Sequence, residues 1–65
     1  MNFKKKLEEL FGKEKAVKIY RKFYKSSYTG AKSISSISKI VRDEITWCHI
    51  ELFDGFEIIE IRVED

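Results

Sequence analysis

The chain has 65 residues, of which 43% are hydrophobic and 37% charged, and its formal net charge is +2. A chain of this length forms one domain, 1–65, with a small core that leaves little volume for a deep substrate cavity. A single cysteine excludes an internal disulfide and a multi-cysteine zinc site, and apolar runs of at most two residues exclude a membrane span. Because no apolar leader follows Met1, we expect a reducing, cytoplasmic setting.

Charge is divided unevenly along the chain. Residues 1–42 carry twelve Lys or Arg and three Glu, a net charge of +9, whereas residues 43–65 carry one Arg and eight Asp or Glu, a net charge of −7. The small overall charge therefore conceals two strongly charged halves. This asymmetry favours a partner that is recognised electrostatically, although the two halves also neutralise each other in part.

Apolar residues at helical spacing predict two N-terminal helices. The first covers 2–11, with Asn2 as its cap and Gly12 just past its end. The second covers 13–25 and carries an apolar and a basic stripe on different faces. The apolar stripe comprises Ala16, Val17, Tyr20, Phe23 and Tyr24, and the basic stripe comprises Lys15, Lys18, Lys22 and Lys25.

The small polar residues of 26–33 predict a turn, and 33–44 predicts a third helix capped by Ser33. Helical spacing is seen in Ile34, Ile37, Ile40 and Val41. A strand would need apolar residues of one parity, and the intervening serines interrupt that pattern. The β-branched residues and serines nevertheless lower helix propensity in this segment.

The most distinctive pattern is a C-terminal hairpin over 45–63. Two apolar runs flank Asp54 and Gly55, the strongest short-range signal for a β-hairpin. A two-residue loop gives a register that sorts the side chains into an apolar and a mixed face. The apolar face contains Thr46, Cys48, Ile50, Leu52, Ile59, Ile61 and Val63, and the mixed face sets Phe53 opposite Phe56, Glu51 opposite Ile58, His49 opposite Glu60 and Trp47 opposite Arg62.

No residue pattern indicates catalysis. Cys48 and His49 are adjacent, but neighbouring side chains of a strand point to opposite faces, so they form no dyad. We expect Cys48 to be buried and His49 to pair with Glu60 across the hairpin. A lone histidine cannot supply a metal site, and the three glycines are scattered. The chain is therefore expected to be no enzyme and to need no cofactor.

These elements predict an α+β fold, with two or three N-terminal helices packed on a C-terminal antiparallel hairpin. The order of three helices and a hairpin resembles a winged-helix domain, in which Ile37 to Arg42 would lie in the middle of the recognition helix. The hairpin departs from that pattern because it is acidic, whereas a wing that contacts phosphate is basic. The resemblance implies DNA binding.

Two surfaces are candidates for binding, and the sequence does not decide between them. Cations and small hydroxyls on the helices predict a nucleic-acid-binding regulator, and an ordinary solvated surface explains them equally well. The candidate contacts are Lys15, Lys18, Lys22, Lys25, Lys32, Ser35, Ser36, Lys39 and Arg42. The mixed hairpin face predicts a homodimer or a protein-interaction module, unless a helix end or the N-terminal segment covers it. Its apolar residues are Ile45, Trp47, Phe53, Phe56 and Ile58.

Overall fold

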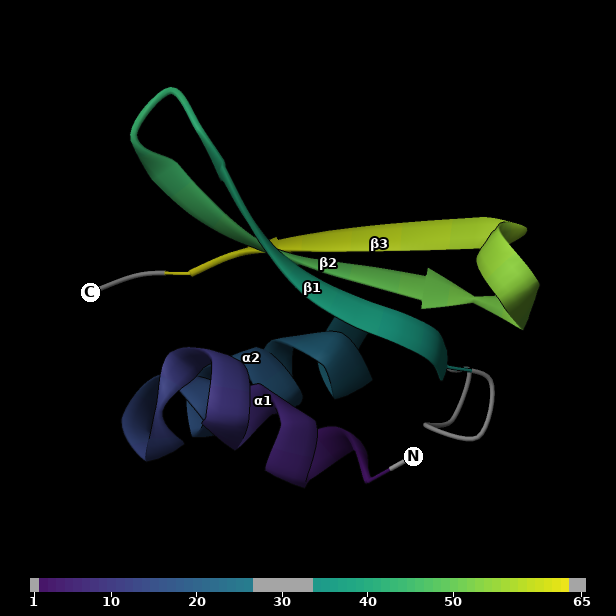
Figure 1. The fold of residues 1–65 in the computed structure, drawn as a ribbon. Coiled ribbons are helices and arrows are strands. Elements are labelled where there is room, and N and C mark those ends of the chain that lie inside the picture. The colour runs from purple at the N-terminus through teal and green to yellow at the C-terminus, as the bar shows by residue number, and fades with distance from the viewer. Residues whose placement is uncertain (1, 27–33, 64–65) are drawn as a thin grey trace.

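The computed structural model describes residues 2–26 and 34–63, which form two helices followed by a three-stranded antiparallel sheet. The strands follow one another in the order β1-β2-β3, and both helices lie on one face of the sheet (Figure 1). The α+β class is therefore confirmed. The elements are α1 (Phe3–Phe11), α2 (Lys13–Ser26), β1 (Ile34–Arg42), β2 (Ile45–Leu52), the short 3-10 turn η2 (Phe53–Gly55) and β3 (Glu57–Arg62).

The predicted ends of the first helix are confirmed. The side-chain oxygen of Asn2 accepts a hydrogen bond of 3.0 Å from the backbone N–H of Lys5, which is the N-cap interaction. At the other end Gly12 has φ +88°, and its N–H donates to the carbonyl of Glu8 at 2.9 Å. A positive φ at this position ends α1 and lets the chain turn directly into α2.

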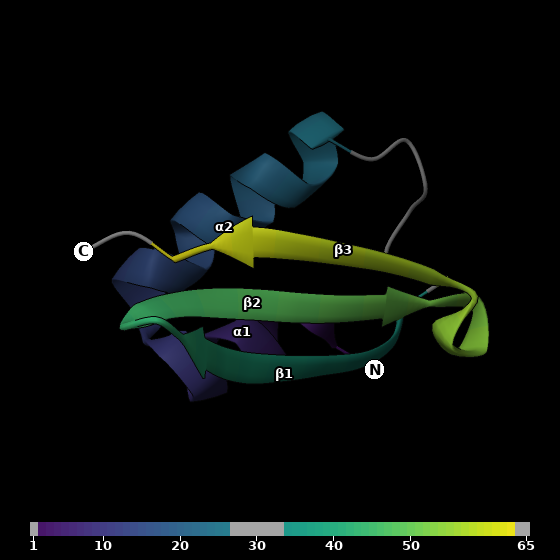
Figure 2. The same ribbon diagram turned by 90° about the horizontal axis from the view of Figure 1, so that it is seen from above.

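The buried face of α2 differs from the prediction. Ala16, Ile19 and Phe23 are buried, whereas Val17 and Tyr24 are 38% and 43% exposed. Viewed from the open side of the sheet, α2 crosses at an angle below β3, and α1 lies below β1 and β2 (Figure 2). Because α2 contacts both α1 and β3, its buried stripe is rotated toward Ile19.

The prediction of a third helix is wrong, because residues 34–42 form strand β1. Ile34 pairs with Leu52 and Ile37 with Ile50, and the register shifts between Ile34 and Ser36. A bulge of this kind adds one residue to a strand, so Ile34 and Ile37 face the same side despite their opposite parity. The β-branched residues that weakened the helix suit this pleated surface. Lys32, Ser33 and most of the predicted turn lie outside the described residues.

The loss of the third helix also removes the resemblance to a winged-helix domain. The segment expected to be the recognition helix is the edge strand of the sheet, and it turns into β2 at Asp43 and Glu44. These two residues have φ +52° and +66°, the left-handed conformation that a two-residue type I′ hairpin turn requires. Neither is glycine, although glycine adopts this conformation most readily.

The predicted register of the C-terminal hairpin is confirmed. Cys48 pairs with Ile61, His49 with Glu60 and Trp47 with Arg62. The predicted turn also forms at Asp54 and Gly55, whose φ values are +56° and +89°, and the N–H of Phe56 donates to the carbonyl of Phe53 at 3.2 Å.

The predicted pairing of Phe53 with Phe56 is wrong. Phe53 has φ +53° and Phe56 has helical dihedral angles, so neither continues its strand. The ladder ends at the pair Leu52 and Glu57. Both aromatic rings are therefore carried by the turn rather than by the sheet.

The core lies between the helices and the inner face of the sheet. The predicted apolar hairpin face supplies the sheet side of this core, since Cys48, Ile50 and Leu52 have no exposed surface. Neither described helix is long and apolar enough to cross a membrane. The buried core residues are Phe3, Leu7, Ala16, Ile19, Phe23, Ile37, Cys48, Ile50, Leu52 and Ile61.

Candidate functional site

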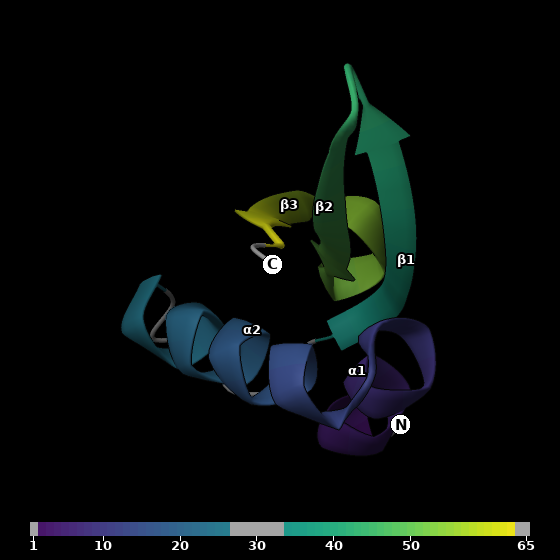
Figure 3. The same cartoon turned by 90° about the vertical axis from the view of Figure 1, so that its left-hand side faces the viewer.

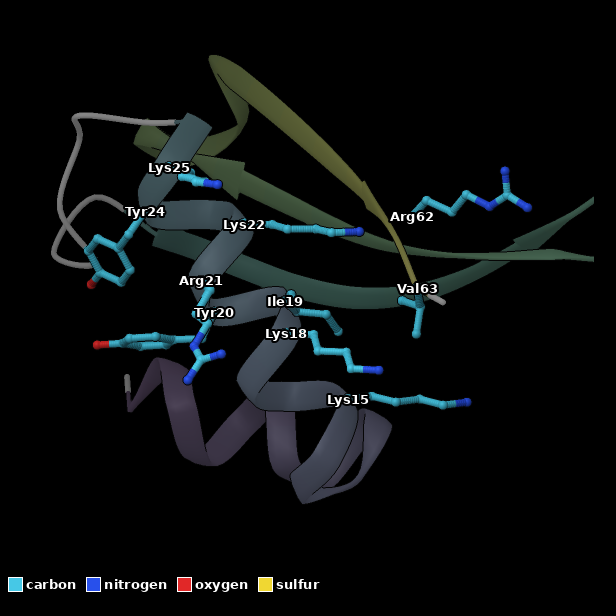
Figure 4. Close-up of a pocket in the computed structure, with 10 residues that line it drawn as sticks. All are labelled: Lys15, Lys18, Ile19, Tyr20, Arg21, Lys22, Tyr24, Lys25, Arg62 and Val63. Atoms are coloured by element: carbon cyan, nitrogen blue, oxygen red, sulfur yellow. The ribbon is translucent and has the colours of Figure 1, made fainter. Parts of the chain in front are cut away.

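A groove runs along α2 beside the end of β3. It encloses about 670 Å³, and its lining residues come mainly from one helix (Figure 4). Helix α2 is in contact with β3 here, and the backbone N–H of Val63 donates to the carbonyl of Thr46 at 2.9 Å, which extends the pairing of β3 with β2 as far as the groove. The residues that line the groove are Lys15, Lys18, Ile19, Tyr20, Arg21, Lys22, Tyr24, Lys25, Arg62 and Val63.

The basic stripe predicted from helical spacing lies in this groove. Lys18, Lys22 and Lys25 are exposed, and Lys15 is partly buried. Because these residues recur every three or four positions, they occupy one flank of α2. Figure 4 shows Lys15, Lys18 and Lys22 extending toward the side on which Arg62 and Val63 lie. The structure therefore adds a cation from β3 to the four lysines of the helix.

The groove has a strongly positive lining. Six of its ten residues carry a positive charge, and none of these ten described residues is acidic. A concave surface of one charge sign concentrates the electric field and attracts counter-charged ligands. We call the set Lys15, Lys18, Lys22, Lys25, Arg21 and Arg62 the basic groove.

Four of the remaining predicted nucleic-acid contacts do not join the basic groove, because they lie on β1, and the fifth, Lys32, lies outside the described residues. Ser35 accepts a hydrogen bond from the N–H of Asp54, and Ser36 donates one to Glu51 at 3.2 Å. Lys39 is exposed and pairs in register with the buried Cys48. Arg42 donates to Glu60 at 2.6 Å, and its guanidinium lies 5.2 Å from the ring centre of Trp47. The cation over the Trp47 ring therefore comes from β1, although Arg62 is the partner of Trp47 in the register of β2 and β3.

Two of the six groove cations were not among the predicted contacts. Arg21 lies between Lys18 and Lys22 in the sequence, and its position on the same helix could have indicated that it lies near the lysine row. Arg62 lies 37 residues beyond Lys25 and joins the groove only because the sheet brings β3 beside α2.

The outer face of the sheet is left open by both described helices (Figure 3). It carries the predicted mixed surface of the hairpin. Ile45 and Trp47 are partly buried, whereas Phe53, Ile58 and Phe56 are 50%, 54% and 91% exposed. Ile58 lies on this face next to the turn that carries Phe53 and Phe56, and we call these three exposed residues the outer apolar patch. Ile45 and Trp47 lie toward the other end of β2. One interpretation of the sequence required a helix end to cover this surface, and no described helix end does so.

A polar network runs across the same outer face. Glu60 accepts from Arg42 at 2.6 Å and lies 2.9 Å from Nδ1 of His49, as the hairpin register predicted for the histidine. The hydrogen bond from His49, and then that from Arg42, lower the pKa of the Glu60 carboxyl. The Nε2 atom of His49 also lies 3.7 Å from Glu51.

The thiol of Cys48 is separated from this network by the sheet itself. Cys48 is buried on the inner face, and desolvation raises the pKa of its thiol to about 12. A thiol with so high a pKa remains protonated at neutral pH and is a poor nucleophile. Within residues 2–26 and 34–63, no three potential metal ligands lie together.

Comparison of the chain with models of known protein families, with curated proteins and with solved structures finds no match. The two surfaces of the molecule are therefore the grounds on which its function is inferred. They are the basic groove beside α2 and the outer apolar patch on the opposite face of the sheet.

Proposed function

We propose that this protein is a small, non-enzymatic nucleic-acid-binding domain that holds phosphates in the basic groove. The observation that carries the proposal is the composition of the groove, in which six of ten lining residues are cations and none of the ten is acidic. Phosphate contacts by Lys and Arg supply most of the affinity of non-specific nucleic-acid binding. A polyanion with regularly spaced charges suits such a lining better than a small neutral ligand.

The shape of the groove supports an elongated ligand. From Lys15 to Lys25 the lysine row follows α2 for about 15 Å, at a rise of 1.5 Å per residue. Several phosphates of one strand can therefore be contacted at once. Arg62 also lines the groove and adds a cation from a second element, β3.

Replacing the four lysines tests this proposal. The variant with Lys15, Lys18, Lys22 and Lys25 changed to Gln should bind a labelled oligonucleotide at least tenfold more weakly at low salt. Its binding should also depend less on salt, with the slope of log K against log salt reduced by about 3. Fluorescence anisotropy at about 50 mM and about 150 mM salt measures both quantities.

The matched control changes Lys4, Lys5, Lys6 and Lys13 to Gln, which removes the same charge away from the groove lining. This control should keep most of the affinity. If both variants lose affinity equally, net charge rather than the groove determines binding. If the wild-type protein binds neither single-stranded nor duplex oligonucleotides at low salt, the proposed function is wrong.

A second candidate function rests on the outer apolar patch, which would bind a second copy of the chain or another protein. It is favoured by the exposure of Ile58 on the open face of the sheet and of Phe53 and Phe56 at the adjoining turn. Exposed apolar patches on small proteins commonly mark interaction surfaces. The double variant Phe56→Ser and Ile58→Ser should abolish self-association in analytical ultracentrifugation. The control, Val17→Ser with Val41→Ser, alters exposed residues elsewhere and should leave self-association intact.

A further inference from the structure

Aromatic side chains lie on the flank of α2 next to the lysine row. The segment from Lys18 to Lys25 alternates cations with apolar and aromatic residues, and Tyr20 and Tyr24 are among the groove lining. Figure 4 shows both tyrosines extending from the side of α2 opposite to Lys18 and Lys22. At 100° per residue, Arg21 falls between the two flanks, so cations and rings form one continuous surface around the helix.

The tyrosine rings are held in place and remain accessible. The ring of Tyr20 lies 5.7 Å from that of Phe3 and 4.8 Å from that of Tyr24. The ring of Tyr24 also meets Phe23 edge-on at 5.2 Å, yet 43% of Tyr24 is exposed. A supported ring with an accessible surface is what base stacking requires, since little side-chain entropy is lost on binding.

Among the described residues, the helix that the sequence predicted for reading a duplex does not form. The segment expected to enter a major groove is strand β1, and its polar side chains Ser36 and Arg42 are engaged with Glu51 and Glu60. In a duplex the base faces are already stacked on one another, so exposed tyrosines would gain nothing there. In a single strand each base presents a free face that can stack on an aromatic side chain.

We infer that the preferred ligand of this surface is single-stranded nucleic acid, with phosphates on the lysine flank and a base stacked on Tyr24. This inference rests on the proposed function and names its ligand class. Lys18, Lys22 and Lys25 neutralise the backbone from one side of α2, and Tyr24, supported by Tyr20, binds a base from the other. The same chemistry is offered by DNA and RNA strands.

The test compares labelled oligothymidylate and oligouridylate of about twelve nucleotides with a duplex of about the same length. The wild-type protein should bind a single strand at least tenfold more tightly than the duplex. Tyr24→Leu should weaken single-strand binding about five- to a hundredfold, the usual contribution of one base stack. It should leave duplex binding and the salt dependence unchanged, because it removes no charge.

Tyr24→Phe is the matched control and should bind as the wild type does, because it keeps the ring. Thermal unfolding shows whether Tyr24→Leu is folded. If that variant does not fold, NMR of the wild-type protein tests the contact directly, because a base stacked on Tyr24 should shift the Tyr20 and Tyr24 ring resonances when oligothymidylate is added. Equal or tighter duplex binding, or ring resonances that do not move, would overturn the inference while leaving the proposed function intact. Absence of binding to every oligonucleotide would instead reject the proposed function. The ratio of the two single-strand affinities separates DNA from RNA.

Discussion

At the scale of single residues, the turn between β1 and β2 contains a local conflict. Asp43 and Glu44 both have positive φ, a conformation that costs a non-glycine residue roughly 1 kcal/mol. The conformation persists because the ladder on either side of it fixes the positions of both strands. Val41 pairs with Thr46, and Arg42 with Ile45. Pairing in the two strands therefore outweighs the preference of the turn residues.

Glu44→Gly should relieve this conflict and stabilise the protein by roughly 0.5 kcal/mol, which remains after the additional chain entropy of glycine is subtracted. Such a gain corresponds to a rise in Tm of a few degrees for a chain of this size. Thermal unfolding followed by circular dichroism measures it. Glu44→Ala is the control, because it removes the same charge without relieving the backbone, and it should give no gain. A Tm that falls in the glycine variant would contradict the assigned turn conformation.

Glu60 should couple the stability of the outer face to pH. Its pKa is lowered in the folded state by His49 and Arg42, so the carboxylate form is stabilised by folding. The contribution is complete above the ordinary glutamate pKa of about 4.3 and is lost as pH falls through the lowered folded-state pKa. Glu60→Gln should therefore reduce stability at about pH 6 but make little difference at about pH 3.

Urea unfolding of the wild type and of Glu60→Gln across that pH range measures this dependence. Glu57→Gln serves as the control, since Glu57 is an exposed glutamate on the same strand. A difference between wild type and Glu60→Gln that persists at the acid end would show that the carboxylate charge is not responsible.

At the scale of secondary structure elements, β1 shows how tertiary pairing determines local conformation. Its apolar residues fit a helical period as well as a strand interrupted by one bulge. Pairing with β2 satisfies the backbone of both strands and buries Ile37, which is 7% exposed, against the helices. Val41 is 61% exposed, because it lies beyond the area that the helices cover.

The two interpretations of this segment predict different mutational effects. In a helix over 33–44, Ile37 and Val41 would share the buried face, and both substitutions would be costly. In the strand, Ile37→Ala should cost about 2 to 5 kcal/mol, because it leaves a cavity in the core. Val41→Ala should change the free energy of unfolding by less than about 0.5 kcal/mol. Chemical denaturation measures both values, and equal losses would contradict the strand.

At the scale of the whole molecule, the two candidate surfaces lie on opposite sides of the sheet. The basic groove belongs to the helix layer, and the outer apolar patch lies on the face that the helices leave open (Figures 1 and 3). The charge asymmetry of the chain becomes a spatial one, with lysines on α2 and most of the acids on the sheet strands and turns. The molecule can therefore offer two independent binding surfaces.

This separation predicts that the two surfaces are uncoupled. The four-lysine variant should self-associate as the wild type does, and Phe56→Ser with Ile58→Ser should bind oligonucleotides with unchanged affinity per chain, since distant sites contribute additively. Ultracentrifugation and anisotropy on both variants, and on their combination, test this expectation. If loss of the outer apolar patch also weakens oligonucleotide binding, then pairing of two chains contributes to the affinity, and the two surfaces form one functional unit.

The sequence by itself determined the features that depend on neighbouring residues. The cap at Asn2, the end of α1 at Gly12 and the turn at Asp54 and Gly55 follow from side-chain and backbone preferences that act over a few positions. The hairpin register follows from them, because a fixed turn and a period of two leave one arrangement with an apolar face. The basic stripe on α2 is likewise a consequence of helical periodicity.

Only the tertiary structure decided the rest, because it depends on contacts between residues far apart in the chain. The bulge in β1 forms against β2 and shifts the alternation of buried and exposed residues by one position. The sequence therefore lacks the regular alternation by which a strand is recognised. Ile19 rather than Val17 is buried because α2 packs against two elements at once. Arg62 joins the basic groove, and the outer apolar patch stays open, because both helices pack on the inner face of the sheet. No local pattern reports on which face of a sheet a distant helix will lie.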